Sequence, residues 1–162
     1  MMAEVVLVNE ITNVPQMDPG APIPLVLADE YRVVLSYLLA GTAVGPLSAI
    51  VCFEAVAMHS LGAPNDETLH GHPLWEKGLK HYAAFSVENS PRIEELERIN
   101  SVHRFHRPER FRALKHFIFT MHDSTFECVA ASFHFITADA EIAAARLKLM
   151  EQMLEAKRTV FV

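Results

Sequence analysis

The side chains best suited to acid–base chemistry lie in residues 116–129, where two apolar runs flank a short polar turn. His122, Asp123 and Glu127 fall at or beside this turn. An imidazole titrates near neutral pH, and a neighbouring carboxylate can orient its ring, so these three residues could form a general acid–base site. The alternative interpretation needs no chemistry: Asp123 forms the turn and Glu127 is a polar residue on a solvated sheet face.

Histidines offer a metal site as a further hypothesis. The chain has nine histidines, and His70 and His72 are two residues apart in a segment without a regular pattern. Imidazoles at this spacing in extended backbone can share a metal ion, and His122 would complete a set of three around a divalent metal. The sequence lacks both the cysteine ligands of a structural zinc site and a His-Glu-x-x-His run, so metal-free surface histidines are the competing interpretation.

Two further segments could contact a ligand. Segment 61–78 reads as a long loop that contains His72 and Trp75, and loops of this length in compact domains are often functional. Segment 104–115 holds five Arg and Lys residues, among them Arg107 and Arg110, which suit an anionic ligand or an acidic partner. In the alternative interpretation, Trp75 anchors its loop in the core and the arginines are merely solvated.

Composition excludes several classes of protein. A chain of 162 residues suits a single domain, residues 1–162, and 51% hydrophobic with 21% charged residues is typical of a folded soluble protein. The net charge of -6 argues against general nucleic-acid binding. The phosphate-binding loop, the dinucleotide fingerprint and the Gly-x-Ser-x-Gly elbow are all absent from the sequence.

Compartment and membrane contact can also be inferred. Cys52 and Cys128 lie in apolar runs, which favours buried, reduced thiols, and the first residues lack a secretory signal pattern, so we expect a cytoplasmic protein. Segment 33–53 has no charged residue, but Gly41, Gly45 and Pro46 interrupt it. Two buried strands joined by a turn explain it better than a membrane span, and we expect no membrane partner.

The remaining patterns predict an α+β fold. Strand-like runs dominate the first two thirds, interrupted by a proline-rich arm or loop at 12–24. A short helix is predicted at about 90–102, opened by Ser90 as cap and Pro91 at its first position, and a C-terminal helix at about 138–158. We therefore expect a mostly antiparallel sheet with both helices packed on one face.

The 116–129 hairpin also specifies a core face, if Met121 pairs with Phe126 across a four-residue tip. Alternate residues then place one set of apolar side chains on a single side: Phe117, Phe119, Met121, Phe126, Cys128 and Ala130. The opposite side carries His116, Thr120 and Glu127, with Thr120 directly opposite Glu127. A shift of register by one residue would exchange the two faces.

Two functional hypotheses follow. In the first, the chain is a small binding or interaction protein that recognises a protein partner or a small anionic ligand. In the second, it is a small enzyme whose hairpin tip and 61–78 loop meet in one pocket, with or without a divalent metal. An exposed sheet edge would allow homo-oligomers to form, although the sequence does not identify that edge.

Overall fold

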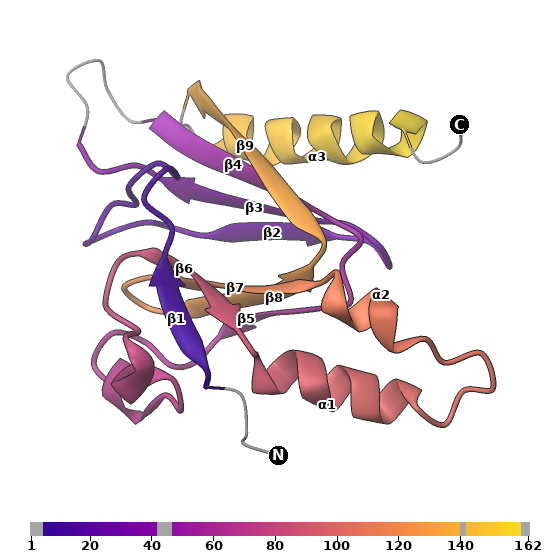
Figure 1. Cartoon of the computed structure of the whole chain (residues 1–162). Coiled ribbons are helices and arrows are strands. Elements are labelled where there is room, and N and C mark those ends of the chain that lie inside the picture. The colour runs from indigo at the N-terminus through magenta and orange to yellow at the C-terminus, as the bar shows by residue number, and fades with distance from the viewer. Residues whose placement is uncertain (1–4, 42–46, 140–141, 160–162) are drawn as a thin grey trace.

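The computed structural model of the chain describes residues 5–41, 47–139 and 142–159. Its strands form two antiparallel sheets that pack face to face (Figure 1). The five-stranded sheet has the order β1 (Leu7–Glu10), β6 (Ala84–Glu88), β7 (Lys115–Thr120), β8 (Thr125–Ala130) and β5 (Met58–Gly62). The four-stranded sheet has the order β2 (Leu25–Ala28), β3 (Val33–Leu38), β4 (Leu47–Glu54) and β9 (Ser132–Asp139).

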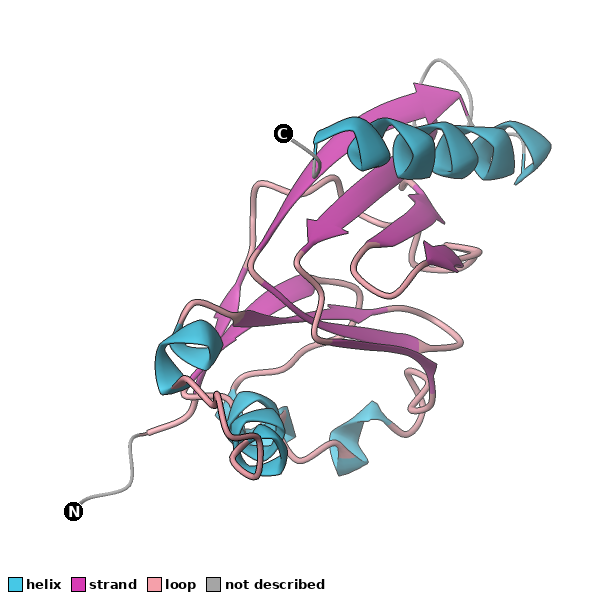
Figure 2. Cartoon of the chain, turned by 90° about the vertical axis from the view of Figure 1, so that its right-hand side faces the viewer, coloured by secondary structure: helices cyan, strands magenta, loops and turns pink. Residues whose placement is uncertain are grey.

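The helices lie outside the two sheets. Helix α3 (Ile142–Thr159) crosses the outer face of the four-stranded sheet, and α1 (Pro91–Asn100) with α2 (Pro108–Arg112) lies beyond the five-stranded sheet (Figures 1 and 2). Two short 3-10 helices, η1 (Leu69–Gly71) and η2 (Trp75–Lys77), belong to the long loop after β5. Gly78 ends η2 with φ of 114°, a left-handed conformation that glycine adopts without a steric penalty.

The main core lies between the sheets and follows from alternation along the strands. On β4, Ala49, Val51 and Phe53 point inward, and the Phe53 ring lies 5.4 Å from that of Phe126 on β8. The intervening residues of β4 point outward: Ile50 and Cys52 pack under α3. Apolar residues on both faces of one strand are typical of a layer covered on both sides.

The predicted α+β class with mostly antiparallel strands is therefore confirmed, but its arrangement differs in two respects. The strands form two sheets, where one was predicted. The helices also lie against different sheets, where one shared face was predicted: α1 lies next to β7, and α3 packs on β2, β3, β4 and β9. Each sheet has its own apolar outer face, and each face has its own cover. Leu69, Leu74 and Leu79 of the long loop cover the five-stranded sheet, and α3 covers the four-stranded sheet.

The two predicted helices form near the expected positions. Ser90 caps α1 by accepting the Arg92 N–H, and Pro91 occupies the first turn, as predicted. Helix α1 has no fully buried residue, and its Ile99 is 57% exposed. On α3 the inner stripe of Ala145, Leu149 and Met153 is buried.

The 116–129 hairpin forms with its predicted core face and a different register. All six residues of that face belong to the core between the sheets. Phe119 pairs with Phe126, and Ile118 with Glu127, so the register differs by two residues from the predicted one and each side chain keeps its face. Side-chain hydrogen bonds to other segments hold the strand ends, from Thr120 Oγ1 to the Lys80 carbonyl and from Thr125 Oγ1 to the Pro64 carbonyl.

Three further predictions concern segment 33–53, a membrane span and the proline-rich stretch 12–24. Segment 33–53 contains the antiparallel strands β3 and β4, as predicted, while much of the predicted Gly-Pro turn lies outside the described residues. No helix in the described ranges is both long enough and apolar enough to cross a membrane. The proline-rich stretch 12–24 is a loop, held by a hydrogen bond from the Tyr37 hydroxyl to the Pro15 carbonyl.

Candidate functional site

Glu127 is the centre of a buried polar network on the outer face of the five-stranded sheet. It lies on β8, diagonal to His116 on β7, because Glu127 pairs with Ile118 and His116 pairs with Val129. His116 Nε2 lies 2.8 Å from Glu127 Oε2, and His72 Nε2, from the long loop, lies 3.3 Å from Oε1. Each carboxylate oxygen is thus bound by one imidazole, and the two rings come from segments far apart in sequence.

Neighbouring groups determine the proton positions in this network. The Leu74 N–H donates to His72 Nδ1 at 3.1 Å, so the proton of the neutral His72 ring lies on Nε2 and is donated to Glu127. Ser90 Oγ lies 2.8 Å from His116 Nδ1 and also accepts the Arg92 N–H. With the Ser90 hydroxyl donating to Nδ1, His116 likewise donates its Nε2 proton to Glu127.

The electrostatic consequence is a carboxylate that is ionised at neutral pH. The hydrogen bonds from His116 and then His72 hold the pKa of Glu127 well below its usual range, although burial opposes this shift. The side chain of Glu127 is only 14% exposed, and those of His72 and His116 are 9% and 3% exposed. Glu127 therefore carries a fixed negative charge beneath the protein surface at neutral pH.

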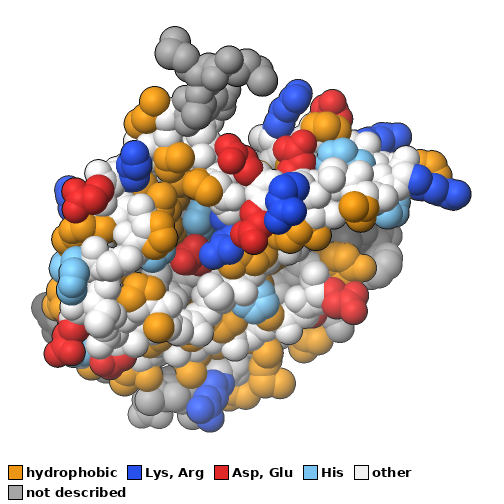
Figure 3. Space-filling model, turned by 90° about the horizontal axis from the view of Figure 1, so that it is seen from below, with side chains coloured by type: hydrophobic (Ala, Val, Ile, Leu, Met, Phe, Trp, Pro, Cys, Tyr) orange, Lys and Arg blue, Asp and Glu red, His pale blue; other side chains and the backbone are white. Residues whose placement is uncertain are grey.

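A pocket of about 250 Å³ opens above this network. We call it the Glu127 pocket; its lining comprises the network residues His72, His116 and Glu127 together with Pro73, Leu74, Pro91, Arg92 and Glu95. Arg92 and Glu95 form an ion pair at 2.9 Å and are about half exposed. Figure 3, which views the molecule from this side, shows acidic and basic side chains close together near the middle of the surface, with a histidine among them.

A second polar cluster lies at the hairpin tip. His122 Nδ1 lies 2.7 Å from Asp66 Oδ2, and the Tyr82 hydroxyl donates to the same oxygen. The backbone joins the same two segments, because the Asp66 N–H donates to the His122 carbonyl. The hydrogen bonds from Tyr82 and His122 lower the pKa of Asp66. We call this cluster the Asp66–His122 pair.

The geometry of the Asp66–His122 pair leaves one ring nitrogen available. The ionised carboxylate of Asp66 accepts a hydrogen bond from Nδ1–H, so the lone pair of the neutral His122 ring lies on Nε2. Among the described residues nothing hydrogen-bonds to that nitrogen, and the His122 side chain is 41% exposed. A carboxylate-oriented imidazole with a free Nε2 is able to accept a proton from a bound molecule.

The structure separates the residues predicted to act together at the hairpin. Glu127 joins His72 in one cluster, while His122 joins Asp66 in the other. Asp123, predicted to be catalytic, is exposed at the turn. The predicted meeting of the 61–78 loop with the hairpin does occur, but in two clusters, where one pocket was expected.

The predicted metal set of His70, His72 and His122 is not assembled. His70 is exposed, while His72 and His122 each bind a different carboxylate. Across residues 5–41, 47–139 and 142–159, no group of three or more His, Cys, Asp or Glu side chains has the arrangement of a metal site. A divalent metal as cofactor stays a prediction without structural support.

The other predicted ligand-binding residues lie outside the Glu127 pocket. Trp75 is partly buried, packs against the cluster of Leu69, Leu74 and Ile118, and contacts His81 edge-on at 5.3 Å. It therefore anchors the long loop. Arg107 and Arg110 are exposed around α2.

Sequence reasoning missed the roles of His116, Ser90, Asp66 and Tyr82. For His116 the signal was present, since alternation places it on the same face as Glu127. The diagonal contact between them became predictable only with the correct register. The bond between Ser90 and His116, and that between Asp66 and His122, join segments whose approach no local pattern specifies.

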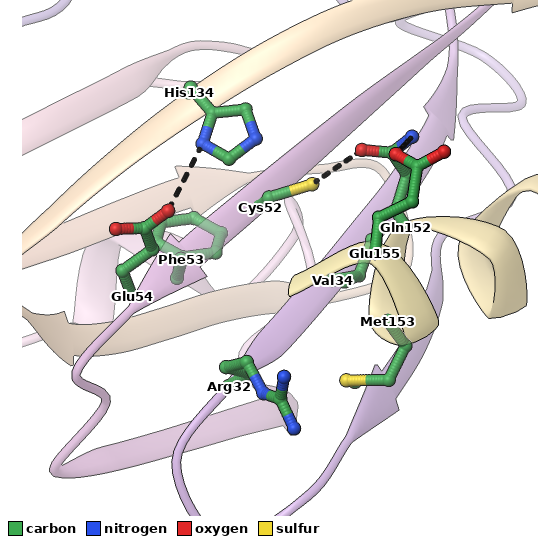
Figure 4. A pocket seen from close by; sticks show the side chains of 9 residues that line it. All are labelled: Arg32, Val34, Cys52, Phe53, Glu54, His134, Gln152, Met153 and Glu155. Atoms are coloured by element: carbon green, nitrogen blue, oxygen red, sulfur yellow. Dashed lines mark hydrogen bonds and ion pairs between the residues drawn. The ribbon is translucent and has the colours of Figure 1, made fainter. Parts of the chain in front are cut away.

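A second cavity, of about 200 Å³, lies between the four-stranded sheet and α3 (Figure 4). The Cys52 thiol points toward Gln152 of α3, 3.8 Å from its Oε1, and burial raises the pKa of this thiol to about 11. Arg32 also lines the cavity and forms an ion pair with Asp29. Cys52 and Cys128 are both buried and free, as predicted.

Comparison of the chain with protein-family models, with curated proteins and with solved structures finds no match in any of the three.

Proposed function

We propose that this chain is a small-molecule binding protein whose ligand occupies the Glu127 pocket. One observation supports this proposal above the others: an ionised, nearly buried carboxylate lies beneath a concave surface, and imidazoles from two separate segments hold both of its oxygens. A buried charge is unfavourable unless it is well bonded. The network keeps such a charge in a fixed position next to the pocket.

The chemistry of the lining favours a ligand with hydrogen-bond donors. Each Glu127 oxygen accepts one hydrogen bond from an imidazole N–H and retains further acceptor capacity. Glu127 and Glu95 carry negative charges, and Arg92 supplies one positive charge that Glu95 already pairs. A small amine or other compact cation fits this balance better than an anion does, and the volume, just below the usual range for ligand pockets, favours a small molecule.

The same geometry disfavours catalysis at this pocket. All four ring nitrogens of His72 and His116 have hydrogen-bond partners, so no imidazole lone pair is free to accept a proton. Glu127 itself, with its lowered pKa, is a weak base. Binding is therefore the activity that the Glu127 pocket supports best.

Ligand titration by NMR tests the proposal with defined probes: n-butylamine and ethanolamine, with butyrate as the anionic comparison. We expect the amines to shift the amide signals of His72, Leu74 and Arg92 in a saturable way, and butyrate to leave them unchanged. Glu127→Gln should abolish the shifts, whereas Glu94→Gln, an exposed change on α1 outside the pocket, should not. Equal shifts in the Glu127→Gln variant, or none in the wild type, would contradict the proposal.

The Asp66–His122 pair supports a second candidate, a small hydrolytic enzyme. The observation that favours this candidate is the free Nε2 of His122, whose Nδ1 is hydrogen-bonded to the Asp66 carboxylate. Hydrolysis of p-nitrophenyl acetate provides the assay. His122→Gln should remove the activity, and Asp66→Asn should reduce it while preserving the fold. A wild-type rate equal to that of free imidazole at the same concentration would exclude this candidate.

The proposal also includes an anionic ligand or acidic protein partner at α2 and a cytoplasmic location. The exposed Arg107 and Arg110 support an anionic ligand or an acidic protein partner at α2, separate from the Glu127 pocket. Two buried free thiols support a reducing compartment, in line with the predicted cytoplasmic location.

A further inference from the structure

The end of α1, the loop after it and α2 form a projecting tip that is strongly basic. We call residues 98–112 the α1–α2 tip; they contain five arginines and one acidic residue, Glu109, and carry a net charge of +4. The whole chain has a net charge of -6, so all other residues together carry -10. The loop between the two helices projects beyond the strands of the five-stranded sheet (Figure 1). Positive charge is thus concentrated at one end of an otherwise acidic molecule.

The arginines of the α1–α2 tip are available to an external anion. All five are exposed, and none of them forms an ion pair with another described residue. They are Arg98, Arg104, Arg107, Arg110 and Arg112. The Arg104 guanidinium lies over the Phe105 ring, 4.3 Å from its centroid. A guanidinium stacked in this way keeps its N–H groups at its edges, where oxygen acceptors can bind them.

The same tip exposes large apolar side chains among its arginines. Ile99, Val102 and Phe105 are 57%, 91% and 62% exposed. Local contacts tie the loop to the end of α1, since His106 Nδ1 lies 2.9 Å from Asn100 Oδ1. At the right-hand end of Figure 3, basic and histidine side chains lie among apolar ones. Exposed apolar side chains that are clustered in this way are typical of an interaction surface.

The combination of charge, apolar side chains and shape favours an anionic lipid bilayer as the partner. Lipid phosphates and carboxylates match the arginines, and the acyl layer beneath them accepts apolar side chains. A nucleic acid would match the charge but offers no apolar layer to Ile99 and Val102. An acidic protein would need a cavity that fits a projecting tip, whereas a bilayer adapts to it. The negative charge on the rest of the molecule turns the tip toward an anionic surface.

We propose that the α1–α2 tip docks this protein on anionic membrane surfaces. Val102 and Phe105 enter the boundary between head groups and acyl chains, and the arginines bind the head groups. The proposal assigns a chemical class to the anionic ligand proposed at α2, and it rests on that ligand. This contact is peripheral and needs no spanning helix, so it replaces the expectation of no membrane partner, which concerned a membrane span. The anionic inner leaflet fits the proposed cytoplasmic location.

Co-sedimentation of the full chain with lipid vesicles tests the proposal. The wild type should bind vesicles of phosphatidylcholine with added phosphatidylserine, lose most of this binding at high salt, and stay in solution with phosphatidylcholine alone. Val102→Asp should weaken the binding by about tenfold, and Arg104→Gln by about fivefold. Equal binding to both kinds of vesicle, or binding to neither, would overturn the proposal.

Two matched controls show whether the tip itself makes the contact. Val5→Asp and Lys77→Gln change exposed residues outside the tip by the same charge, and both should bind vesicles as the wild type does. Circular dichroism checks that all four variants keep their fold. Equal losses in the control and tip variants, or full binding by Val102→Asp, would contradict docking through the tip.

Soluble polyanions separate the membrane proposal from the anionic ligand on which it rests. Polyglutamate and a single-stranded oligonucleotide are added separately, and the amide NMR signals of residues 107–112 are followed. If either probe shifts these signals while vesicles do not bind, the partner is a soluble polyanion and the membrane proposal fails. If vesicles and both probes all fail to bind, the proposed anionic ligand or acidic partner at α2 fails as well.

Discussion

Replacing Glu127 by leucine and, separately, by glutamine tests whether the network requires a hydrogen-bond acceptor at this position or only a side chain that fills the space. Leucine fills most of the volume but accepts no hydrogen bond, so the Nε2–H groups of His72 and His116 both lose their partner. Both rings are more than nine-tenths buried, so water replaces that partner poorly. Each unsatisfied buried donor costs about 1–3 kcal/mol.

The expected size of the leucine effect follows from the two bond lengths. The 2.8 Å bond from His116 is near the optimum for a charged pair, and the 3.3 Å bond from His72 is weaker. We therefore place the loss for Glu127→Leu at about 3 kcal/mol, the lower end of the range for breaking a buried pair from one side.

The change Glu127→Gln should cost less, because the network can adapt to an amide. The carbonyl of the introduced amide can face His72, whose Nε2 must stay a donor as long as Leu74 donates to Nδ1. The amide NH₂ then faces His116, which can move its proton to Nδ1 and donate it to the Ser90 hydroxyl oxygen. We expect a loss of about 1 kcal/mol.

Urea unfolding at neutral pH measures both variants, with the transition midpoint compared at a constant m-value. Glu94→Leu and Glu94→Gln are the controls, since Glu94 is exposed on α1, and both should stay within about 0.5 kcal/mol of the wild type. Equal stability of Glu127→Leu and Glu127→Gln would refute the expectation, because the imidazoles would then not depend on an acceptor at this position.

Three further outcomes are expected. The pKa of Glu127 is lowered in the folded protein, so the ionised side chain contributes its full stabilisation above the unfolded glutamate pKa of about 4.3. This stabilisation is lost as the pH falls below that value. Unfolding curves of the wild type and of Glu127→Gln should therefore converge in acid. Ser90→Ala removes the α1 cap and a partner of His116, and should lower the free energy of unfolding by about 2 kcal/mol in urea titrations, while Ser90→Thr should retain most of it. With its pKa raised to about 11, Cys52 should react with iodoacetamide at pH 8 roughly a hundredfold more slowly in the folded than in the unfolded protein, and equal rates would contradict its burial against α3.

Much of the fold was predictable because local patterns determine it. Alternating apolar residues indicated the strands and the core face of the 116–129 hairpin, and the Ser90–Pro91 pair indicated the start of α1. The number of sheets was not predictable in this way. Strand β4 has apolar residues on both faces, and alternation alone does not say whether a helix or a second sheet covers each face.

The candidate site was predictable only in part, because its contacts join distant segments. His72 and Glu127 were both selected from the sequence, but each was assigned to a different partner set. Their actual contact depends on how the 61–78 loop folds over the sheet, with Leu69 and Leu74 buried against Ile118. The predicted register failed for a similar reason, since Thr120 and Thr125 are held by backbone groups of Lys80 and Pro64, which no pattern within the hairpin reveals.

The long loop therefore determines which kind of chemistry each cluster can perform. It supplies His72 to Glu127 and Asp66 to His122, so in each cluster one partner comes from the 116–129 hairpin and one from the loop. At Glu127 the loop completes a closed network in which every imidazole nitrogen is occupied, and a fixed charge of this kind favours binding. At His122 the loop occupies only Nδ1 and leaves Nε2 free, which favours proton transfer. The two functional hypotheses thus belong to two different places, the outer face of the five-stranded sheet and the hairpin tip, and variants of Glu127 and His122 can test them independently.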